Sequence, residues 1–100
     1  MEYQLVMEFT GDSPENFQRV ADLERMLDEG LESGEVDGND VGLGVINIFI
    51  ITEYPDICFA EAIDIVSGRL TPTAAGYRSL ESEDYVRLWP TGDKTPFELR

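Results

Sequence analysis

Oxygen-bearing side chains gather in the middle of the chain, where their spacing first suggests a calcium site. Asp37, Asn39 and Asp40 fall within four positions, and carboxylate and amide oxygens are the ligands that an EF-hand loop offers to Ca²⁺. A loop beginning at Asp37 would need side-chain oxygens at its fifth and twelfth positions, which are Val41 and Ile48 in this chain. The spacing therefore excludes an EF-hand, and we expect a tight turn without a metal ion. The alternative is a weak, adventitious cation site among Glu35, Asp37 and Asp40.

Two glycines follow directly and suggest a phosphate-binding loop. From Asp40 the chain runs Asp-x-Gly-x-Gly, with the glycines at positions 42 and 44. A phosphate cradle needs the N-terminus of a helix after its glycines, whereas an apolar, β-branched run follows here over residues 45–52. We therefore assign Asp40, Gly42 and Gly44 a structural role at a turn or bulge that leads into a strand.

The usual catalytic groups are scarce in this chain. It has no histidine, which removes the commonest general base and a frequent metal ligand. Cys58 lies near the start of a predicted helix, where the dipole could lower its pKa, but its neighbours are apolar and we expect a small buried side chain. The carboxylates of Glu81, Glu83 and Asp84 could exchange protons, yet with 21 acidic residues such clusters arise by chance. We therefore predict no catalytic residue, no cofactor and no enzyme activity.

Net charge is the strongest global feature of the chain. There are 21 Asp and Glu against 7 Lys and Arg, which gives a formal net charge of −14. A surface this negative repels phosphate backbones, so we expect no nucleic-acid partner. The same field attracts basic proteins and also favours solubility. Two interpretations stay open: the acidic surface recruits a basic protein, or it only keeps the protein in solution.

Length and cysteine content indicate the domain organisation and the compartment. A chain of 100 residues fits a single domain over residues 1–100, with a turn-rich tail at 91–100 that we expect to be loosely attached. Cys58 is the only cysteine, which excludes an intramolecular disulfide and permits a reducing compartment. The first residues lack the features of a signal peptide, and the apolar runs are too short to span a bilayer. We therefore expect a cytoplasmic protein with no membrane partner.

Hydropathy patterns divide the first half of the chain into strand, helix and strand. Residues 3–9 alternate apolar and polar side chains with the period of a half-buried strand. Ser13 and Pro14 are a typical N-cap and first helical residue, and apolar residues recur at helical spacing up to a glycine at position 30. A short strand with glycine-rich turns is expected over residues 35–44.

The second half of the chain predicts a strand, a helix and a closing pair of short runs. Residues 45–52 are dense in β-branched side chains and form the clearest strand. A helix is expected over residues 56–67, and the runs 74–80 and 83–90 are expected to form a hairpin or one bent strand. The order βαββαβ plus an extra C-terminal strand predicts an α+β protein. Its antiparallel sheet would be ferredoxin-like, with both helices on one face.

Strand alternation leaves one face of this predicted sheet apolar and aromatic. If the helices cover the face that carries Ile46, Ile48 and Ile50, the opposite face is open to solvent. Exposed apolar patches often mark interfaces, and Tyr, Trp and Arg are enriched at binding hot spots. We therefore predict a binding surface on the open face, made of these residues: Asn47, Phe49, Ile51, Tyr77, Arg78, Tyr85, Arg87 and Trp89.

Three interpretations of this open face are compatible with the sequence. A second copy of the chain would bury it in a sheet-to-sheet homodimer, or another protein or a small molecule would bind to it. Alternatively, the tail would fold back and cover it with Phe97 and Leu99. Asn47 lies in the middle of this face, where it either accepts hydrogen bonds from Arg78 or Arg87 or acts as a specificity contact.

A set of acidic, glycine, asparagine and aromatic residues is spread over residues 37–90. It comprises Asp40, Gly42, Gly44, Asn47-Ile48-Phe49, Tyr77-Arg78, Tyr85 and Leu88-Trp89-Pro90. This set resembles a family of small uncharacterised bacterial proteins with a ferredoxin-like core. In that family an Asp-x-Gly-x-Gly turn leads into an Asn-Ile-Phe strand, followed by an Ala-Tyr-Arg element and a Leu-Trp-Pro close. Here Gly76 separates Ala75 from Tyr77. The resemblance supports the fold and implies no established activity.

Binding without catalysis is the function that these observations favour. The first hypothesis is an interaction protein that acts through the open face, most simply as a homodimer. The second is an acidic inhibitor or immunity protein that masks a basic partner, by analogy with small acidic proteins of similar size. The third is a small-molecule-binding or catalytic ferredoxin-like domain, in which Asn47, Arg78 and Tyr85 would line a pocket.

Overall fold

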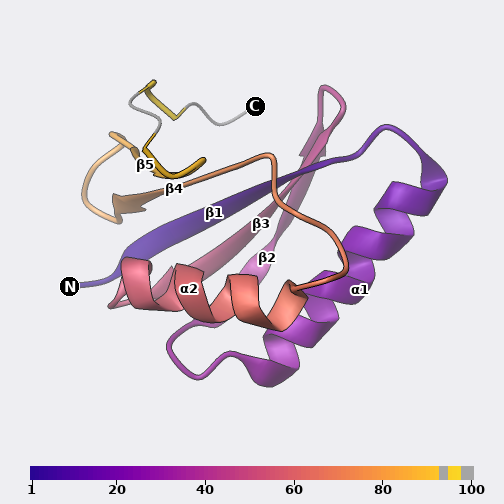
Figure 1. Cartoon of the computed structure of the whole chain (residues 1–100). Coiled ribbons are helices and arrows are strands. Elements are labelled where there is room, and N and C mark those ends of the chain that lie inside the picture. Colours follow the sequence, from indigo (N-terminus) through magenta and orange to yellow (C-terminus); the bar gives the residue numbers. More distant parts are fainter. Residues whose placement is uncertain (93–94, 98–100) are drawn as a thin grey trace.

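A five-stranded antiparallel sheet forms the centre of the computed structural model, which describes residues 1–92 and 95–97 (Figure 1). Its strands are β1 (Tyr3–Thr10), β2 (Glu35–Gly42), β3 (Val45–Thr52), β4 (Ala74–Ser79) and β5 (Val86–Trp89). The helices are α1 (Pro14–Gly30) and α2 (Pro55–Val66). Across the sheet the strands follow the order β2-β3-β1-β4-β5, and every neighbouring pair is antiparallel.

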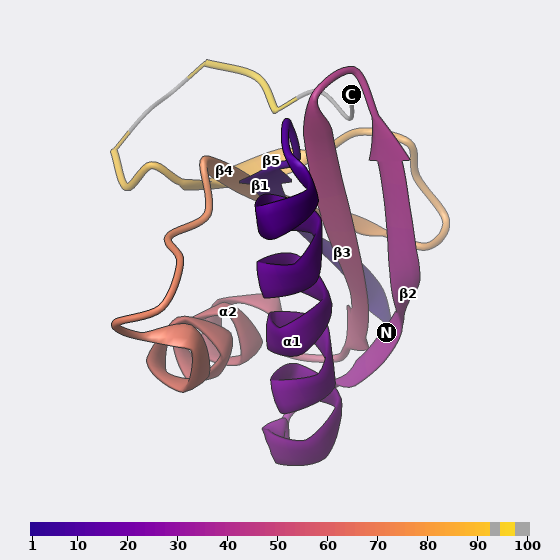
Figure 2. The ribbon, with the colours of Figure 1, turned by 90° about the vertical axis from the view of Figure 1, so that its right-hand side faces the viewer.

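The two helices make the crossover connections of the sheet. α1 joins β1 to β2 and contacts the intervening β3, and α2 joins β3 to β4 and contacts the intervening β1. Both helices lie on the same face of the sheet (Figure 1), and in the view of Figure 2 α1 lies between α2 and the β2–β3 hairpin. This βαββαβ arrangement is ferredoxin-like, and β5 extends it beyond β4. The predicted fold class is therefore confirmed.

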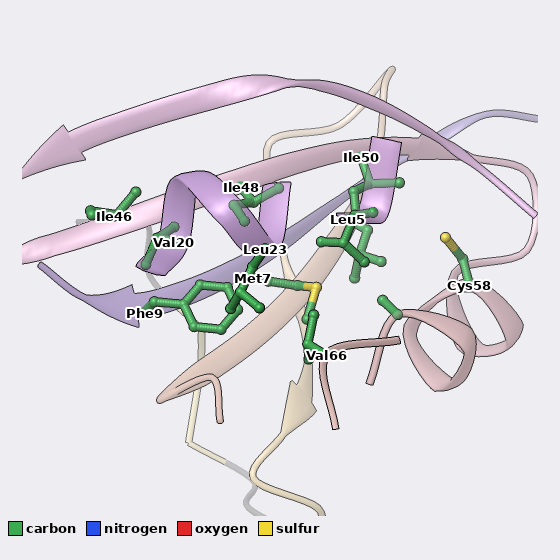
Figure 3. Close-up of a cluster of buried hydrophobic side chains, with 12 residues drawn as sticks. Leu5, Met7, Phe9, Val20, Leu23, Ile46, Ile48, Ile50, Cys58 and Val66 are labelled. Atoms are coloured by element: carbon green, nitrogen blue, oxygen red, sulfur yellow. The ribbon is translucent and has the colours of Figure 1, made fainter. Parts of the chain in front are cut away.

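The core lies between the helices and the face of the sheet beneath them, which we term the inner face; the opposite face is the outer face. Figure 3 shows this cluster, which consists of Leu5, Met7, Phe9, Val20, Leu23, Leu27, Ile46, Ile48, Ile50, Cys58, Ala62 and Val66. The members from β1 and β3 alternate along their strands and pair directly across them. Burying one such large apolar side chain contributes about 1.5–3 kcal/mol. The apolar side chains that alternate along β1 and β3, as predicted, therefore form the main packing layer of the protein.

The first helix begins at its predicted signal and the second within one residue of its predicted start. Ser13 caps α1, since its hydroxyl accepts a hydrogen bond from the backbone N–H of Asn16 at 3.2 Å, and Pro14 is the first helical residue. α2 runs from Pro55 to Val66, close to the expected range. Within residues 1–92 and 95–97, neither helix is long and apolar enough to cross a membrane.

The segment from Asp37 to Asp40 is part of a strand, so the prediction of a tight turn there was wrong. It lies inside β2, where the register with β3 shifts between Val36 and Gly38. This shift leaves Asp37 as the extra residue of a β-bulge. The sequence did not distinguish the two structures, because aspartate, asparagine and glycine favour tight turns and also suit the irregular backbone of a bulge.

The reversal of the chain comes later, between β2 and β3. Leu43 and Gly44 have φ angles of 48° and 78°. Two successive positive φ angles are typical of a two-residue type I′ hairpin turn, in which glycine is favoured. The predicted role of Gly44 at a turn is therefore confirmed, whereas Asp40 and Gly42 are the strand residues that precede it.

A carboxylate on α2 holds the loop that follows α1. Glu61 accepts hydrogen bonds from the backbone N–H of Ser33 at 3.0 Å, from its hydroxyl at 2.6 Å, and from the backbone N–H of Glu32 at 3.1 Å. These donors favour the charged form and lower the pKa of Glu61 below its usual range. The carbonyl oxygen of Ser33 in turn accepts a hydrogen bond from the hydroxyl of Thr52 at 2.5 Å. The loop, the end of β3 and α2 are thus joined at one point.

We expect Glu61→Gln to lower the stability of the fold at neutral pH and to have little effect at acidic pH. A carboxyl group whose pKa is lowered by folding stabilises the folded state above its ordinary pKa of 4.5. That contribution is lost as the pH falls through the lower pKa of the folded state. Urea unfolding of both proteins at about pH 7 and about pH 3 measures the difference.

The matched control for this experiment is Asp64→Asn, which removes an exposed carboxylate from the same helix. The control should leave the free energy of unfolding nearly unchanged at both pH values. A deficit of Glu61→Gln that is equal at the two pH values would contradict the role of the carboxylate charge.

Candidate functional site

The strand register places most of the predicted binding residues on the outer face. Those residues are Asn47, Phe49 and Ile51 of β3, Arg78 of β4, Arg87 of β5, and Tyr85 just before β5. Val6 and Glu8 of β1 lie between them on the same face. The prediction succeeds here because β1 pairs with β3 and with β4 without a register shift, so simple alternation holds.

Tyr77 and Trp89 lie on the inner face, so their assignment to the open surface was wrong. Adjacent strand residues point to opposite faces, so Tyr77 and Arg78 cannot share one. The ring of Tyr77 meets that of Tyr3 edge-on, with 5.6 Å between the ring centres. Trp89 is turned inward by the register shift between β4 and β5. Its ring lies 6.3 Å from that of Phe59 on α2.

The C-terminal segment covers the middle of the outer face. Phe97 is 5% exposed and packs on Val6 of the central strand. Phe49 packs against the same cluster, and the ring of Tyr85 lies 5.2 Å from that of Phe97. Figure 1 shows the yellow end of the chain passing over β4 and β5 on the side opposite the helices. The prediction that the tail folds back is therefore confirmed for Phe97, whereas Leu99 lies outside the described residues.

A glycine and an arginine hold Phe97 in this position. Gly76 of β4 lies beneath the ring, and a Cβ atom at this glycine would stand 2.7 Å from Cγ of Phe97, closer than carbon atoms approach. Arg87 donates hydrogen bonds to the carbonyl oxygens of Thr95 at 2.7 Å and of Pro96 at 3.2 Å. Its guanidinium lies 5.7 Å from the centre of the Phe97 ring. Arg87 therefore stabilises the position of the C-terminal segment through contacts within the chain.

Polar side chains of the outer face bond to one another and to the backbone. The side-chain oxygen of Gln4 accepts hydrogen bonds from Arg78 at 3.1 Å and from the hydroxyl of Tyr85 at 3.2 Å. Arg78 also donates to the backbone carbonyl oxygens of Ser79, the last residue of β4, and of Ser82 in the turn that follows. Neither Arg78 nor Arg87 donates to Asn47, contrary to one expectation, and Asn47 is fully buried. A partner would not reach Asn47 in this structure.

Arg78 and Tyr85 do share a hollow, but it lies in the turn between β4 and β5. Its volume is about 490 Å³, and its lining also includes Leu80, Glu81, Ser82 and Glu83. Asn47 does not line it. The three residues predicted for a small-molecule pocket are therefore not brought together.

The described residues offer no reactive centre of the kinds considered from the sequence. Cys58 is fully buried on the core side of α2, and burial raises the pKa of its thiol. This confirms the expected small buried side chain. Across residues 1–92 and 95–97, no group of three or more His, Cys, Asp or Glu side chains is placed to hold a metal ion.

A hollow lined by tyrosines lies at the end of the sheet where β1 and α2 begin. We term it the tyrosine hollow; its lining residues are Tyr3, Glu53, Tyr54, Pro55, Asp56, Ile57 and Tyr77. Its volume is about 310 Å³. Tyr54 and Ile57 are 58% and 63% exposed, although large apolar and aromatic side chains usually lie inside a protein. The hollow therefore presents uncovered aromatic and apolar surface.

An acidic hollow adjoins the tyrosine hollow and shares Glu53 and Tyr54 with it. Its volume is about 260 Å³, and its lining includes Glu2, Glu32, Glu35 and Ile51. Sequence patterns did not indicate either hollow, because their residues come from separate segments of the chain. The one local signal is Glu53-Tyr54-Pro55-Asp56-Ile57, which places exposed aromatic and acidic residues at the start of a helix.

The surface charge of the described residues is almost uncompensated by ion pairs. Among residues 1–92 and 95–97 a single ion pair is present, between Arg25 and Asp22 of α1 at 3.1 Å. The side chains of Arg25 and Asp22 are 66% and 44% exposed, and a pair so accessible to solvent contributes at most about 1 kcal/mol. Arg78 and Arg87 bond to acceptors within the chain and neutralise no carboxylate. The negative field of the protein therefore extends into solvent.

Comparisons with known protein families, with characterised proteins and with solved structures gave no match to this chain. The resemblance of residues 37–90 to a family of small bacterial proteins therefore stays a prediction. Since a shared fold does not define a function, the chemistry of the surface is what bears on the function.

We expect Phe97→Ala to destabilise the fold by about 1.5–3 kcal/mol, the contribution of burying one phenylalanine side chain. Gly76→Ala should also destabilise it, because the added methyl group displaces the same ring. The two effects should not add in full, since the two atoms nearest to the new methyl group, at 2.7 and 2.9 Å, belong to the ring that the first substitution removes. Urea unfolding of both single variants and of the double variant measures the coupling, and additive losses would refute the contact.

Proposed function

We propose that this chain is a non-catalytic binding protein that masks a basic protein partner with its acidic surface. The observation that carries the proposal is the uncompensated charge: a formal net charge of −14 and, between described residues, one exposed ion pair. A field of this sign draws a basic partner toward the protein and raises its association rate. An inhibitor or immunity protein for a basic enzyme would act in this way.

The outer face offers less binding surface than the sequence suggested. Phe97 occupies its centre, and Arg78 and Arg87 bond within the chain. The part toward β3 retains Phe49 and Ile51, which are partly exposed. A homodimer that packs two outer faces together is the second candidate. Phe49 and Ile51 lie two positions apart on the same face of β3, and such neighbouring apolar side chains would form the centre of the interface.

The proposal includes a cytoplasmic location and excludes nucleic acid as the partner. A lone buried thiol at Cys58 suits a reducing compartment. The field that attracts a basic protein also repels a phosphate backbone.

The proposal is tested by affinity capture from the lysate of the native host at low salt, followed by elution with increasing salt. We expect one basic protein in stoichiometric amount. Neutralising exposed carboxylates on different elements, in the variant Glu15→Gln, Glu35→Gln, Asp40→Asn, Glu53→Gln, Asp64→Asn, should slow its association by about tenfold. Stopped-flow or surface-binding kinetics with the purified partner measures the rate.

The control keeps the charge and changes the side chains at the same positions, with aspartate in place of each glutamate and glutamate in place of each aspartate. It should bind like the natural chain. Association that is indifferent to salt and to neutralisation would refute an electrostatic partner, and so would the absence of any stoichiometric basic partner.

A homodimer through the outer face makes a separate prediction. Sedimentation equilibrium would give about twice the mass of 11.2 kDa, and Ile51→Glu would return the chain to a monomer because it buries a charge in the interface. Glu35→Gln, on the neighbouring strand position, is the control and should leave the mass unchanged. A monomer at all concentrations would exclude the second candidate.

A further inference from the structure

The tyrosine hollow brings together three segments that are far apart in the chain. Tyr3 comes from the start of β1, Tyr77 from β4, and Tyr54 from the residue that precedes α2. The rings of Tyr3 and Tyr77 stand almost perpendicular, at 84°, so one presents a face where the other presents an edge. The result is a preformed aromatic wall, because Tyr3 and Tyr77 are held by the register of β1 and β4.

Charge around the hollow has one sign. Glu53 and Asp56 line it, and Glu2, Glu32 and Glu35 line the acidic hollow next to it. Among the described residues no arginine or lysine lines either hollow. The start of α2 contributes about half a positive charge, which the carboxylates outweigh several times. A cation is therefore the complementary ligand.

We propose that the tyrosine hollow binds an arginine side chain of the basic partner, an inference that rests on the proposed function. A guanidinium stacks on an aromatic face and pairs with a carboxylate through two parallel hydrogen bonds. A lysine ammonium is a more strongly hydrated point charge, which makes a poorer match to a flat aromatic wall. Tyrosine and arginine are also the residues that most often dominate binding energy at interfaces.

The hollow is large enough for an arginine side chain, and none of the side chains in residues 1–92 and 95–97 fills it. Its volume of about 310 Å³ lies at the lower end of ligand pockets, which suits a single side chain. The middle of the outer face, by comparison, is covered by a residue of the same chain, Phe97. Exposed Tyr54 and Ile57 at the rim would exclude water from the ion pair once a partner is bound.

The test uses hexa-arginine and hexa-lysine peptides with the full chain at low salt, followed by NMR of the backbone amides and tyrosine side chains. We expect hexa-arginine to bind about tenfold more tightly than hexa-lysine, in line with a stacked and paired guanidinium. The resonances of Tyr3, Tyr54 and Tyr77 should shift most. Shifts that spread over α1 and the β2–β3 hairpin would overturn the assignment.

A variant that keeps the charge separates the hollow from the general field. Tyr54→Ser with Ile57→Ser removes the exposed rim; Tyr54 caps α2 through its backbone alone, so the fold should persist. The matched control is Val41→Ser with Leu43→Ser, which removes two side chains of 52% and 88% exposure from the distant hairpin. The rim variant should lose the preference for arginine and the control should retain it.

The outcomes distinguish this inference from the proposed function. If both peptides bind with equal affinity and the rim variant behaves like the control, the basic-partner function stands and the arginine site is refuted. If neither peptide binds at low salt, the inference and the electrostatic basis of the proposed function fail together. Loss of arginine preference in the rim variant alone supports both.

Discussion

The central strand β1 must be covered on both faces, and the rest of the structure depends on this constraint. Its residues from Leu5 to Phe9 are all buried, so apolar cover is needed above and below the sheet. The helices provide it on the inner face. On the outer face Phe97 packs over Val6, and Glu8, only 2% exposed, accepts a hydrogen bond from the hydroxyl of Thr73 at 3.1 Å. An antiparallel sheet can leave one face to water, but here the middle of the outer face, over β1, is covered as well.

Because both faces of β1 are covered, the side chains that a partner could reach lie at the edges of the sheet. The middle of the sheet is used for packing, as the contact between Phe97 and Gly76 shows. The end where β1 and α2 begin has no such cover, and there the ferredoxin-like topology brings the starts of β1 and α2 close to β4. Tyr54 and Ile57 stay exposed at this end beside unpaired acidic residues. The fold therefore separates a packed centre of the sheet from a charged, aromatic rim at this end.

Irregular pairing accounts for most of what the residues alone did not predict. β1 and β3 pair without a shift, so their period-two pattern was sufficient to predict which side chains enter the core. β2 and β5 each take part in a register shift, which adds a residue that alternation cannot count. For this reason the segment after Val36 was taken for a turn, and Trp89 was placed on the wrong face. Tyr77 was misplaced for a simpler reason, since it alternates with Arg78.

Local chemistry by itself determined the element order, the helix starts at Ser13-Pro14, the buried state of Cys58, the turn at Gly44 and the uncompensated negative charge. Each depends on neighbours within a few positions or on composition, which a sequence contains in full. Only the tertiary structure decided that Phe97 returns to β1, that Arg87 is used to hold it, and that three distant tyrosines line one hollow. Those contacts join residues far apart in the chain, and their geometry is set by strand register and packing rather than by any local preference.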